Sequence, residues 1–299
     1  MANQKNRFQR TIYQKMEEKN ISVHRSFGQR LISEIRANKL AMFSVIVLGI
    51  IIVAVILAPL APYDPDRIDA GSKLLAPGKE HWFGTDNLGR DYFTRALYGG
   101  RVSLQVGVFS MLVSTVFGTL WGTISGYLGG VADLVMMRIV DILMSIPSFL
   151  LLIILNAFIA PGLVTMVFII SLFAWMGVAR IARAETMTLK ERDFVLASRS
   201  MGEKKLLIML FHIVPNMIPT IIVSGSISIA NAILTESSLS FLGFGVQLPM
   251  SSWGNMLQGA QAQILARPYM AFFPGLLILL TVLSFNVLGD VFRKVFEAE

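Results

Sequence analysis

The chain has 299 residues, of which 54% are hydrophobic and 15% are charged, with a mean hydropathy of +0.64. A soluble domain carries about a quarter charged residues, so these values exclude an ordinary soluble protein and predict an integral membrane protein. The net charge of +7 does not indicate nucleic-acid binding, because the positive residues cluster beside apolar runs. The chain contains no cysteine, which excludes disulfides, thiolate chemistry and cysteine-based metal sites.

The first 38 residues are polar and basic, and the first apolar run starts only after them. A cleavable signal peptide would place its apolar region earlier. We therefore expect residues 1–38 to form a cytoplasmic segment and residues 39–61 to be retained as a membrane anchor. The stretch 27–40 is amphipathic. Such a stretch can lie on membrane lipid or contact a partner protein, and its sequence is compatible with both.

Six segments have the roughly 20 predominantly apolar residues that a membrane-spanning helix needs. They cover residues 40–60, 102–125, 139–159, 163–180, 217–237 and 271–290. Lys and Arg are enriched in cytoplasmic loops. With the N-terminus inside, 19 of these residues lie on the cytoplasmic side and seven on the outer side. We predict an all-α integral membrane protein with six transmembrane helices, both termini in the cytoplasm and a cytoplasmic tail over 292–299.

Residues 62–100 form a predicted extracytoplasmic loop that is too long for a simple turn. Its first part is rich in Pro, Asp and Gly, which favour turns. Its last part predicts a short helix from Asp91 to Tyr98.

The second span carries small residues at every fourth position. This spacing lets helix backbones approach closely in lipid, where no hydrophobic force drives helices together. The row drifts around the helix, which suits a crossing of two helices. We expect the row to pack within one bundle, with lining of a pathway as the alternative. Its members are Ser110, Ser114, Gly118, Gly122 and Gly126.

A charged segment between the fourth and fifth spans, residues 180–215, contains seven Lys or Arg residues. Arg180 and Arg183 are expected to end the fourth span at the inner interface. Thr188 and Glu191 have the Thr-x-x-Glu spacing of a capping box, which predicts a helix start at this position.

The predicted helix after this start has one small-to-apolar face, made by Phe194, Ala197, Ser198 and Met201. Gly202 suits a left-handed turn that ends the helix. Residues 203–214 then predict a second helix, which Pro215 stops. The first helix could lie on the lipid surface or dock in a groove of a cytoplasmic protein, and its pattern leaves both open.

Residues 238–270, between the fifth and sixth spans, contain several helix-breaking residues. Apolar irregular backbone at membrane depth must be surrounded by protein or by a water-filled cavity. A lid-like or re-entrant element near the outer mouth and a simple interfacial loop fit this segment equally well. The helix-breaking residues are Gly243, Gly245, Pro249 and Gly254.

Several motifs of catalysis and ion transport are missing from the sequence. No G-x-x-x-x-G-K-[ST] motif occurs, so another chain must hydrolyse any ATP that drives this protein. The histidines lie on separate segments, and we expect no enzyme activity and no cofactor or metal on this chain. No row of acidic residues crosses a span, which disfavours a secondary transporter or channel. Snorkelling or capping near span ends is expected for Asp133, Asp141, Glu236 and Asp290.

The charged segment resembles the EAA loop in the membrane subunits of ATP-binding-cassette (ABC) importers. Ala197, Gly202 and Pro215 match that signature, whereas Leu196 stands where the family has Glu. Four further blocks resemble the second permease subunit of dipeptide and oligopeptide importers, in the same order along the chain. The blocks are HWFGTDNLGRDYFTRALYGGRVSL, GYLGGVADLVMMRIVDILMSIPSFLL, ESSLSFLGFGVQLPMSSWGNML and FFPGLLILLTVLSFNVLGD.

This resemblance implies a type I ABC importer permease fold in the cytoplasmic membrane, with a core over 101–291 and a coupling loop over 180–216. It implies a homologous permease partner, two ATPase subunits that hold ATP and Mg, and an extracytoplasmic substrate-binding protein. Membrane lipid is a further expected partner, and nucleic acid is not. Peptides are the expected substrate, with nickel or another small solute as the alternative.

In the family, the cytoplasmic helix seats in a groove of the ATPase, and the resemblance extends this role to seven residues here. The expected contacts are Arg192, Phe194, Leu196, Ala197, Ser198, Met201 and Gly202. A second set is expected at the outer gate or in contact with the binding protein. It comprises Ser240, Phe241, Gly243 and Gly245.

Overall fold

Residues 26–160 and 162–297 are described by the structure, a computed structural model in which they form helices joined by loops and no β-strand. Most of the predicted N-terminal segment and the last two residues of the tail lie outside the described residues. Five helices are long and apolar enough to cross a membrane. They are α3 (Lys39–Ile56), α4 (Tyr92–Leu128), α7 (Leu163–Leu189), α11 (Ile218–Phe241) and α13 (Tyr269–Glu297).

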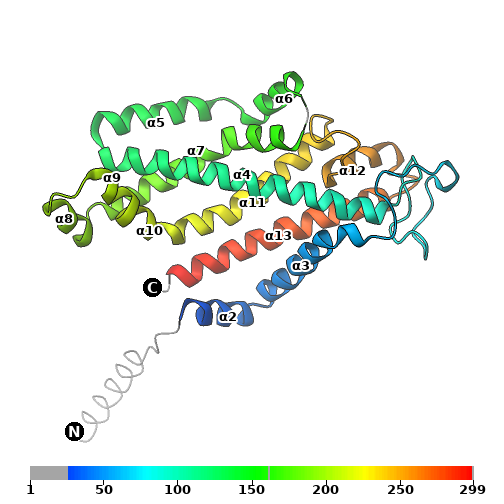
Figure 1. Cartoon of the computed structure of the whole chain (residues 1–299), viewed down its shortest axis with the longest axis horizontal. Coiled ribbons are helices and arrows are strands. Elements are labelled where there is room, and N and C mark those ends of the chain that lie inside the picture. Colours follow the sequence, from blue (N-terminus) through cyan, green and yellow to red (C-terminus); the bar gives the residue numbers. More distant parts are fainter. Residues whose placement is uncertain (1–25, 161, 298–299) are drawn as a thin grey trace, which may run out of the picture.

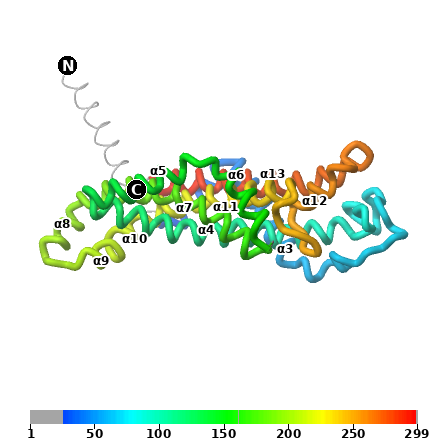
Figure 2. The backbone as a smooth tube through the Cα atoms, turned by 90° about the horizontal axis from the view of Figure 1, so that it is seen from above, coloured from blue at the N-terminus to red at the C-terminus, as the bar shows by residue number. Residues whose placement is uncertain are grey.

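The long helices run along one common axis, as Figure 1 shows, and Figure 2 shows that together they form a shallow layer. One end of the bundle, the charged end, carries the short helices that follow α7. These are α8 (Asp193–Ser200), α9 (Lys205–Leu207), the π-helical turn η3 (Ile208–Ile213) and α10 (Val214–Asn216). The amphipathic helix α2 (Phe27–Ala37) packs beside the last turn of α13, where the Phe27 and Phe296 rings stack 4.9 Å apart.

The opposite end, the lid end, carries the loop before α4 and the connection between α11 and α13 (Figure 1). The loop contains the 3₁₀ turns η1 (Ala58–Leu60) and η2 (Ala70–Ser72). The connection contains α12 (Trp253–Ala260) and η4 (Gln261–Gln263). We refer to residues 242–260 as the lid segment.

The third predicted span, 139–159, is not one straight helix. It is represented by α5 (Gly130–Ser145) and α6 (Ser148–Phe158), whose axes are bent by 78°. The break falls at Ile146, which is extended, and Pro147. A residue before proline is pushed out of the helical region, and proline itself lacks the N–H that would continue the helix. The described residues therefore contain five continuous candidate spans, and six if the bent pair is one span.

The small-residue row lies in the seam between α4 and α7, which is the most extensive helix pair. All five members are buried. A Cβ atom on Gly118 would lie 2.6 Å from the carbonyl oxygen of Trp175, and one on Gly122 would lie 2.2 Å from that of Ala179. The prediction that the row packs within one bundle is confirmed.

The helix of the fourth predicted span, α7, continues past Arg180 and Arg183 to Leu189. The end of the membrane span at these two arginines stays a prediction. Both arginines are neutralised by α5. Arg183 makes a bidentate ion pair with Asp133, with 2.6 Å between Nη2 and Oδ2. Arg180 Nη2 lies 2.6 Å from Asp141 Oδ1. These two aspartates are therefore ion-pair partners between helices rather than snorkelling or capping groups.

The predicted helix at Asp91 is confirmed in its start but not in its end. The Asp91 side chain accepts a hydrogen bond from the backbone N–H of Thr94 at 2.7 Å, which caps the helix that begins at Tyr92. The helix does not stop at Tyr98 but continues without a break as α4.

Replacing Gly122 by Ala should destabilise the protein by about 1–3 kcal/mol, because the new methyl group overpacks a rigid helix seam. Thermal unfolding of the detergent-purified protein measures this as a lower midpoint. Gly49→Ala in α3 is the matched control, since nothing lies within 4 Å of its Cβ position. Equal midpoints for the two variants would contradict the role of the seam.

Candidate functional site

At the charged end, the helix predicted to start at Thr188 starts later. Thr188 still lies in α7, where its hydroxyl donates to the carbonyl oxygen of Ala184 at 3.3 Å. Arg192 occupies the cap position of α8, and no capping box forms at Thr188 and Glu191. That prediction was wrong because α7 itself extends to Leu189 and so includes Thr188.

One side of α8 packs inward through Val195 and Ser198, which are three residues apart and both buried. Val195 contacts a cluster formed with Ile208, Ile213 and Met217. The predicted face is therefore wrong for Ser198, whose hydroxyl donates to the carbonyl oxygen of Phe194 at 3.0 Å.

The other side of α8 is uncovered. Phe194, Leu196 and Met201 are 40%, 41% and 79% exposed, which is unusual for apolar side chains on a short polar helix. Arg192 and Ala197 are also exposed. Gly202 is exposed as well, so six of the seven residues expected to contact an ATPase lie on the surface. Ser198 is the buried one.

Gly202 ends α8 with φ = +82°, and its N–H donates to the carbonyl oxygen of Arg199 at 3.1 Å. Nothing lies within 4 Å of its Cβ position, so the backbone conformation and not the available space requires glycine here. The predicted left-handed turn is confirmed.

The helix after Gly202 contains a π-helical turn, and sequence reasoning missed it. Its His212 Nε2 lies 2.9 Å from Glu203 Oε2 and 3.5 Å from Ser198 Oγ, which ties η3 to the end of α8. Pro215 does not stop the helical run, which reaches Asn216. Proline is tolerated there because it lies in the first turn of α10, where its missing N–H has no helical partner.

At the lid end, three of the four residues expected at an outer gate come together. Ser240 is buried in the last turn of α11, and Gly243 has φ = +87° just after that helix. A Cβ on Gly245 would lie 1.8 Å from Ser240 Oγ, so the lid segment touches α11 here with no room for a side chain. Phe241 is 40% exposed and lies apart from this contact.

Glu236 is fully buried in α11, and the expectation that it snorkels or caps is wrong. Its Oε1 accepts a hydrogen bond from Ser240 Oγ at 2.7 Å, and its Oε2 accepts from Ser103 Oγ of α4 at 3.0 Å and from Ser237 Oγ at 3.3 Å. Ser252 Oγ of the lid segment reaches Ser240 Oγ at 3.4 Å. We call these five residues the Glu236 cluster.

The Glu236 cluster joins α4, α11 and the lid segment. Trp253 extends the connection, because its backbone N–H donates to Ser103 Oγ at 3.3 Å and its indole N–H donates to Ala96 O at 2.9 Å. Sequence reasoning missed the cluster. The available signal was the serine-rich run around Glu236 within an otherwise apolar span, since an ionisable residue in a span is a functional hypothesis by default.

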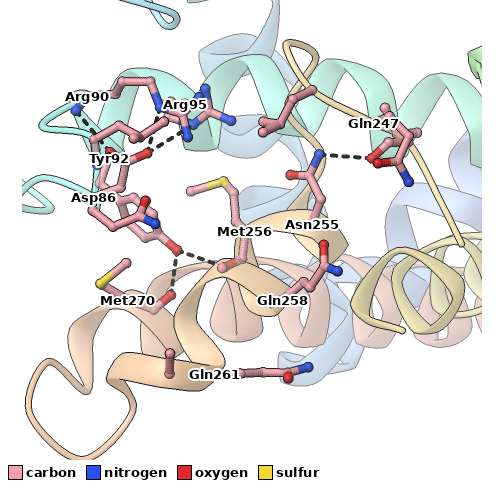
Figure 3. A pocket seen from close by; sticks show the side chains of 16 residues that line it. Asp86, Arg90, Tyr92, Arg95, Gln247, Asn255, Met256, Gln258, Gln261 and Met270 are labelled. Atoms are coloured by element: carbon pink, nitrogen blue, oxygen red, sulfur yellow. Dashed lines mark hydrogen bonds and ion pairs between the residues drawn. The ribbon is translucent and has the colours of Figure 1, made fainter. Parts of the chain in front are cut away.

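A cavity of about 750 Å³ opens beside the lid segment. Figure 3 shows Asp86, Arg90 and Arg95 on one side of it and Gln247 and Asn255 across from them. Arg90 Nε lies 2.7 Å from Asp86 Oδ2, and Arg95 Nε lies 3.7 Å from the same oxygen. The remaining lining comes from α12, the lid segment and the start of α13.

The loop before α4 holds the charged wall of this cavity in place. Asp86 Oδ1 accepts hydrogen bonds from the backbone N–H groups of Leu88 and Arg90, at 2.8 and 3.0 Å. Earlier in the same loop, hydrogen bonds from the Ser72 hydroxyl and the Gly71 N–H lower the pKa of Asp69.

A second cavity, of about 350 Å³, lies between α6, α7 and α11. Its α11 wall contains four polar residues beside Ile227 and Ala232, and no charged residue. The polar residues of that wall follow helical spacing and are Ser224, Ser228, Asn231 and Thr235. Within the described residues, no group of three or more His, Cys, Asp or Glu side chains could hold a metal ion.

Replacing Glu236 by Ala should lower the free energy of unfolding by about 1–3 kcal/mol, because buried serine hydroxyls lose their acceptor. Glu236→Gln keeps an acceptor oxygen and should retain most of the stability. Thermal unfolding of the purified transporter compares the two variants. If both unfold at the same temperature, the carboxyl group does not hold the cluster together.

Comparisons with known proteins place the chain in a family. The family described as "Binding-protein-dependent transport system inner membrane component" matches residues 118–299. The family described as "N-terminal TM domain of oligopeptide transport permease C" matches residues 26–77. The oligopeptide transport system permease protein OppC of Bacillus subtilis is 38% identical over 285 residues, covering 95% of this chain and 92% of that protein. The dipeptide transport system permease protein DppC of the same organism is 40% identical over 267 residues, covering 89% and 83%.

A chain of the MetNI methionine ABC transporter, solved in inward-facing conformations, shares the fold with a TM-score of 0.56. The two are 19% identical, and the match covers 67% of this chain and 96% of that chain. This likeness confirms the predicted type I ABC importer permease fold. The chain belongs to the family of binding-protein-dependent transport system inner membrane components, multi-pass proteins of the cell membrane.

Proposed function

We propose that this chain is the permease subunit of an ATP-driven importer of dipeptides or oligopeptides. The observation that carries this proposal is the match to OppC and DppC, at 38% and 40% identity over most of each chain. The names of these relatives do not favour nickel or another small solute, and the fold does not favour a secondary transporter or channel.

The cavity between α6, α7 and α11 is our candidate for part of the translocation pathway. Peptide main chains are polar and uncharged between their ends, and the uncharged α11 wall offers hydrogen-bonding partners to them. Asn231 is exposed on this wall, and Ser228 and Thr235 are only partly covered. Polar groups in a span need protein or water around them, so we infer that a homologous permease covers this side and completes a pathway that alternates its access.

We infer that the charged end faces the cytoplasm, in agreement with the excess of Lys and Arg on that side. The uncovered side of α8 then docks in a groove of an ATPase through Phe194, Leu196 and Met201, beside Arg192. Two such ATPase subunits hold ATP and Mg and carry out hydrolysis, since this chain has no phosphate-binding loop. Leu196 in place of the family Glu makes this contact apolar.

The lid end then faces the extracytoplasmic binding protein. Ser240, Gly243 and Gly245 are proposed for the outer gate because they join the lid segment to α11 at a contact too close for larger residues. Phe241 is exposed beside this contact and is proposed to touch the binding protein.

ATP-driven uptake is the direct test. Proteoliposomes that contain both permeases, both ATPases and the binding protein should import a peptide with ATP, and uptake should persist when the proton gradient is collapsed. Loss of uptake with the gradient would favour secondary transport. The purified chain alone should hydrolyse no ATP, and measurable turnover would overturn the assignment of hydrolysis to other subunits.

Gly202→Pro should uncouple transport from ATP hydrolysis, because proline cannot adopt φ = +82° and has no N–H for the bond to Arg199. We expect uptake to fall about 5- to 150-fold, the range of typical coupling free energies, while hydrolysis continues. Gly202→Asn is the matched control, since Asn tolerates the left-handed region. An unaffected uptake rate in an assembled Gly202→Pro complex would refute the role of this turn.

A further inference from the structure

We propose that the 750 Å³ cavity at the lid end is a binding site for the carboxyl-terminal end of a peptide substrate. This inference rests on the proposed function and names a site within it. The cavity is built from four parts of the chain: the loop before α4, the first turn of α4, the lid segment with η4 after it, and the start of α13. Its size falls in the range of about 300–1,000 Å³ that is typical of ligand sites.

The charged wall favours an anion. Among the residues that line the cavity, the charged ones are Asp86, Arg90 and Arg95, which together carry one excess positive charge. The side chain of Arg90 is 90% buried, since only 10% of it is exposed. Its Nε is taken by Asp86, but its two Nη groups have no hydrogen-bond partner within the described residues. A guanidinium edge with free donors matches the two oxygens of a carboxylate.

The opposite wall offers groups that match peptide bonds. The side-chain carboxamide of Gln258 lines the cavity and has no hydrogen-bond partner in the described part of the chain, so its donor and acceptor are both free. The amide nitrogens of Gln247 and Gln261 donate to backbone carbonyls, at 2.9 Å to Gly243 and 3.2 Å to Phe241, which leaves their oxygens available as acceptors. A carboxamide pairs with a peptide bond because each has one donor side and one acceptor side.

Asn255 also lines the cavity, but its carboxamide is already hydrogen-bonded within the protein. Its oxygen accepts from the Ser252 N–H, and its nitrogen donates to Val246 and Met250 carbonyls, so it shapes the wall and has little left for a ligand. A Cβ on Gly243 would lie 2.9 Å from Gln258 Nε2, so the glycine leaves space for this carboxamide.

The site is directly connected to the Glu236 cluster. Val246 lines the cavity, and its backbone N–H donates to Ser240 Oγ at 3.2 Å. One hydrogen bond therefore connects the wall of this site to α11, the helix that also lines the cavity between α6, α7 and α11.

This chain contains no cysteine, so a single introduced cysteine is its only site of alkylation. We would place a single cysteine by Gln258→Cys in the assembled complex of permeases and ATPases, without binding protein, and measure alkylation by a maleimide. Millimolar tetra-alanine should slow alkylation about tenfold, and its carboxyl-terminal amide should slow it much less, because it lacks the charge that Arg90 binds. Leu265→Cys, at a position 97% exposed and outside the cavity, is the control and should be unaffected.

Equal effects of the acid and the amide, or no effect of either, would overturn the site. Protection by ligand-free binding protein, without peptide, would also overturn it by assigning the cavity to protein docking. ATP-driven uptake of tetra-alanine by the complete wild-type transporter distinguishes a failure of this site from a failure of the proposed function. Uptake without protection removes this site and leaves the proposed function standing, whereas failure of uptake for this and longer peptides removes the proposed function itself.

A second arm uses two glutamines of the same turn. Gln261→Leu removes an acceptor from the cavity, whereas Gln263→Leu changes a residue of η4 that does not line it. In the Gln258→Cys background, only Gln261→Leu should raise the tetra-alanine concentration needed for half-protection, by about threefold to tenfold. Equal values for both variants would contradict the role of the carboxamides.

Discussion

A carboxyl group buried in a membrane bundle must find its partners within the protein, and Glu236 finds them on three segments at once. Hydroxyl groups of α4, α11 and the lid segment surround it, so these segments meet at one polar point in otherwise apolar surroundings. The position of the lid segment follows from this contact. So does the shape of the cavity at the lid end, because Val246 and Asn255 are held beside the same cluster.

The charged end is connected to the bundle by packing rather than by a polar cluster. Val195 carries α8 onto Ile208, Ile213 and Met217. The Met217 sulfur in turn lies 3.5 Å from Thr186 Oγ1 of α7 and 3.8 Å from Thr123 Oγ1 of α4. A displacement of α8 therefore reaches the seam between α4 and α7 through buried contacts. That seam is too close-packed to absorb it, since its glycines leave no free space.

Much of the fold could be predicted from the sequence, because apolar runs, small-residue spacing and glycine conformation are local properties. The five long helices, the α4 row and the turn at Gly202 belong to this group. The misses depended on partners distant in the chain. Arg183 pairs with Asp133 of α5, 50 residues earlier in the chain, and this pairing has no local signature.

Dependence on distant partners also explains which parts of the candidate sites could be predicted from the sequence. The apolar residues of α8 were identified from spacing, but the inward turn of Ser198 depends on the later π-helical turn. Glu236 was seen as a span-end residue, since nothing in its own segment reveals Ser103 on another helix. The cavity at the lid end combines residues from four parts of the chain, and only the folded structure brings them together.

The shallow layer of Figure 2 has a consequence for the cell that makes this protein. An unassembled copy would expose Asn231 and neighbouring hydroxyl groups of α11 to hydrocarbon, which cannot satisfy them. In the proposed assembly, the partner permease covers these groups and stabilises the native form by binding it. Production in excess of its partners would leave a less stable pool open to proteolysis, so supply of those partners would set how much of this chain persists.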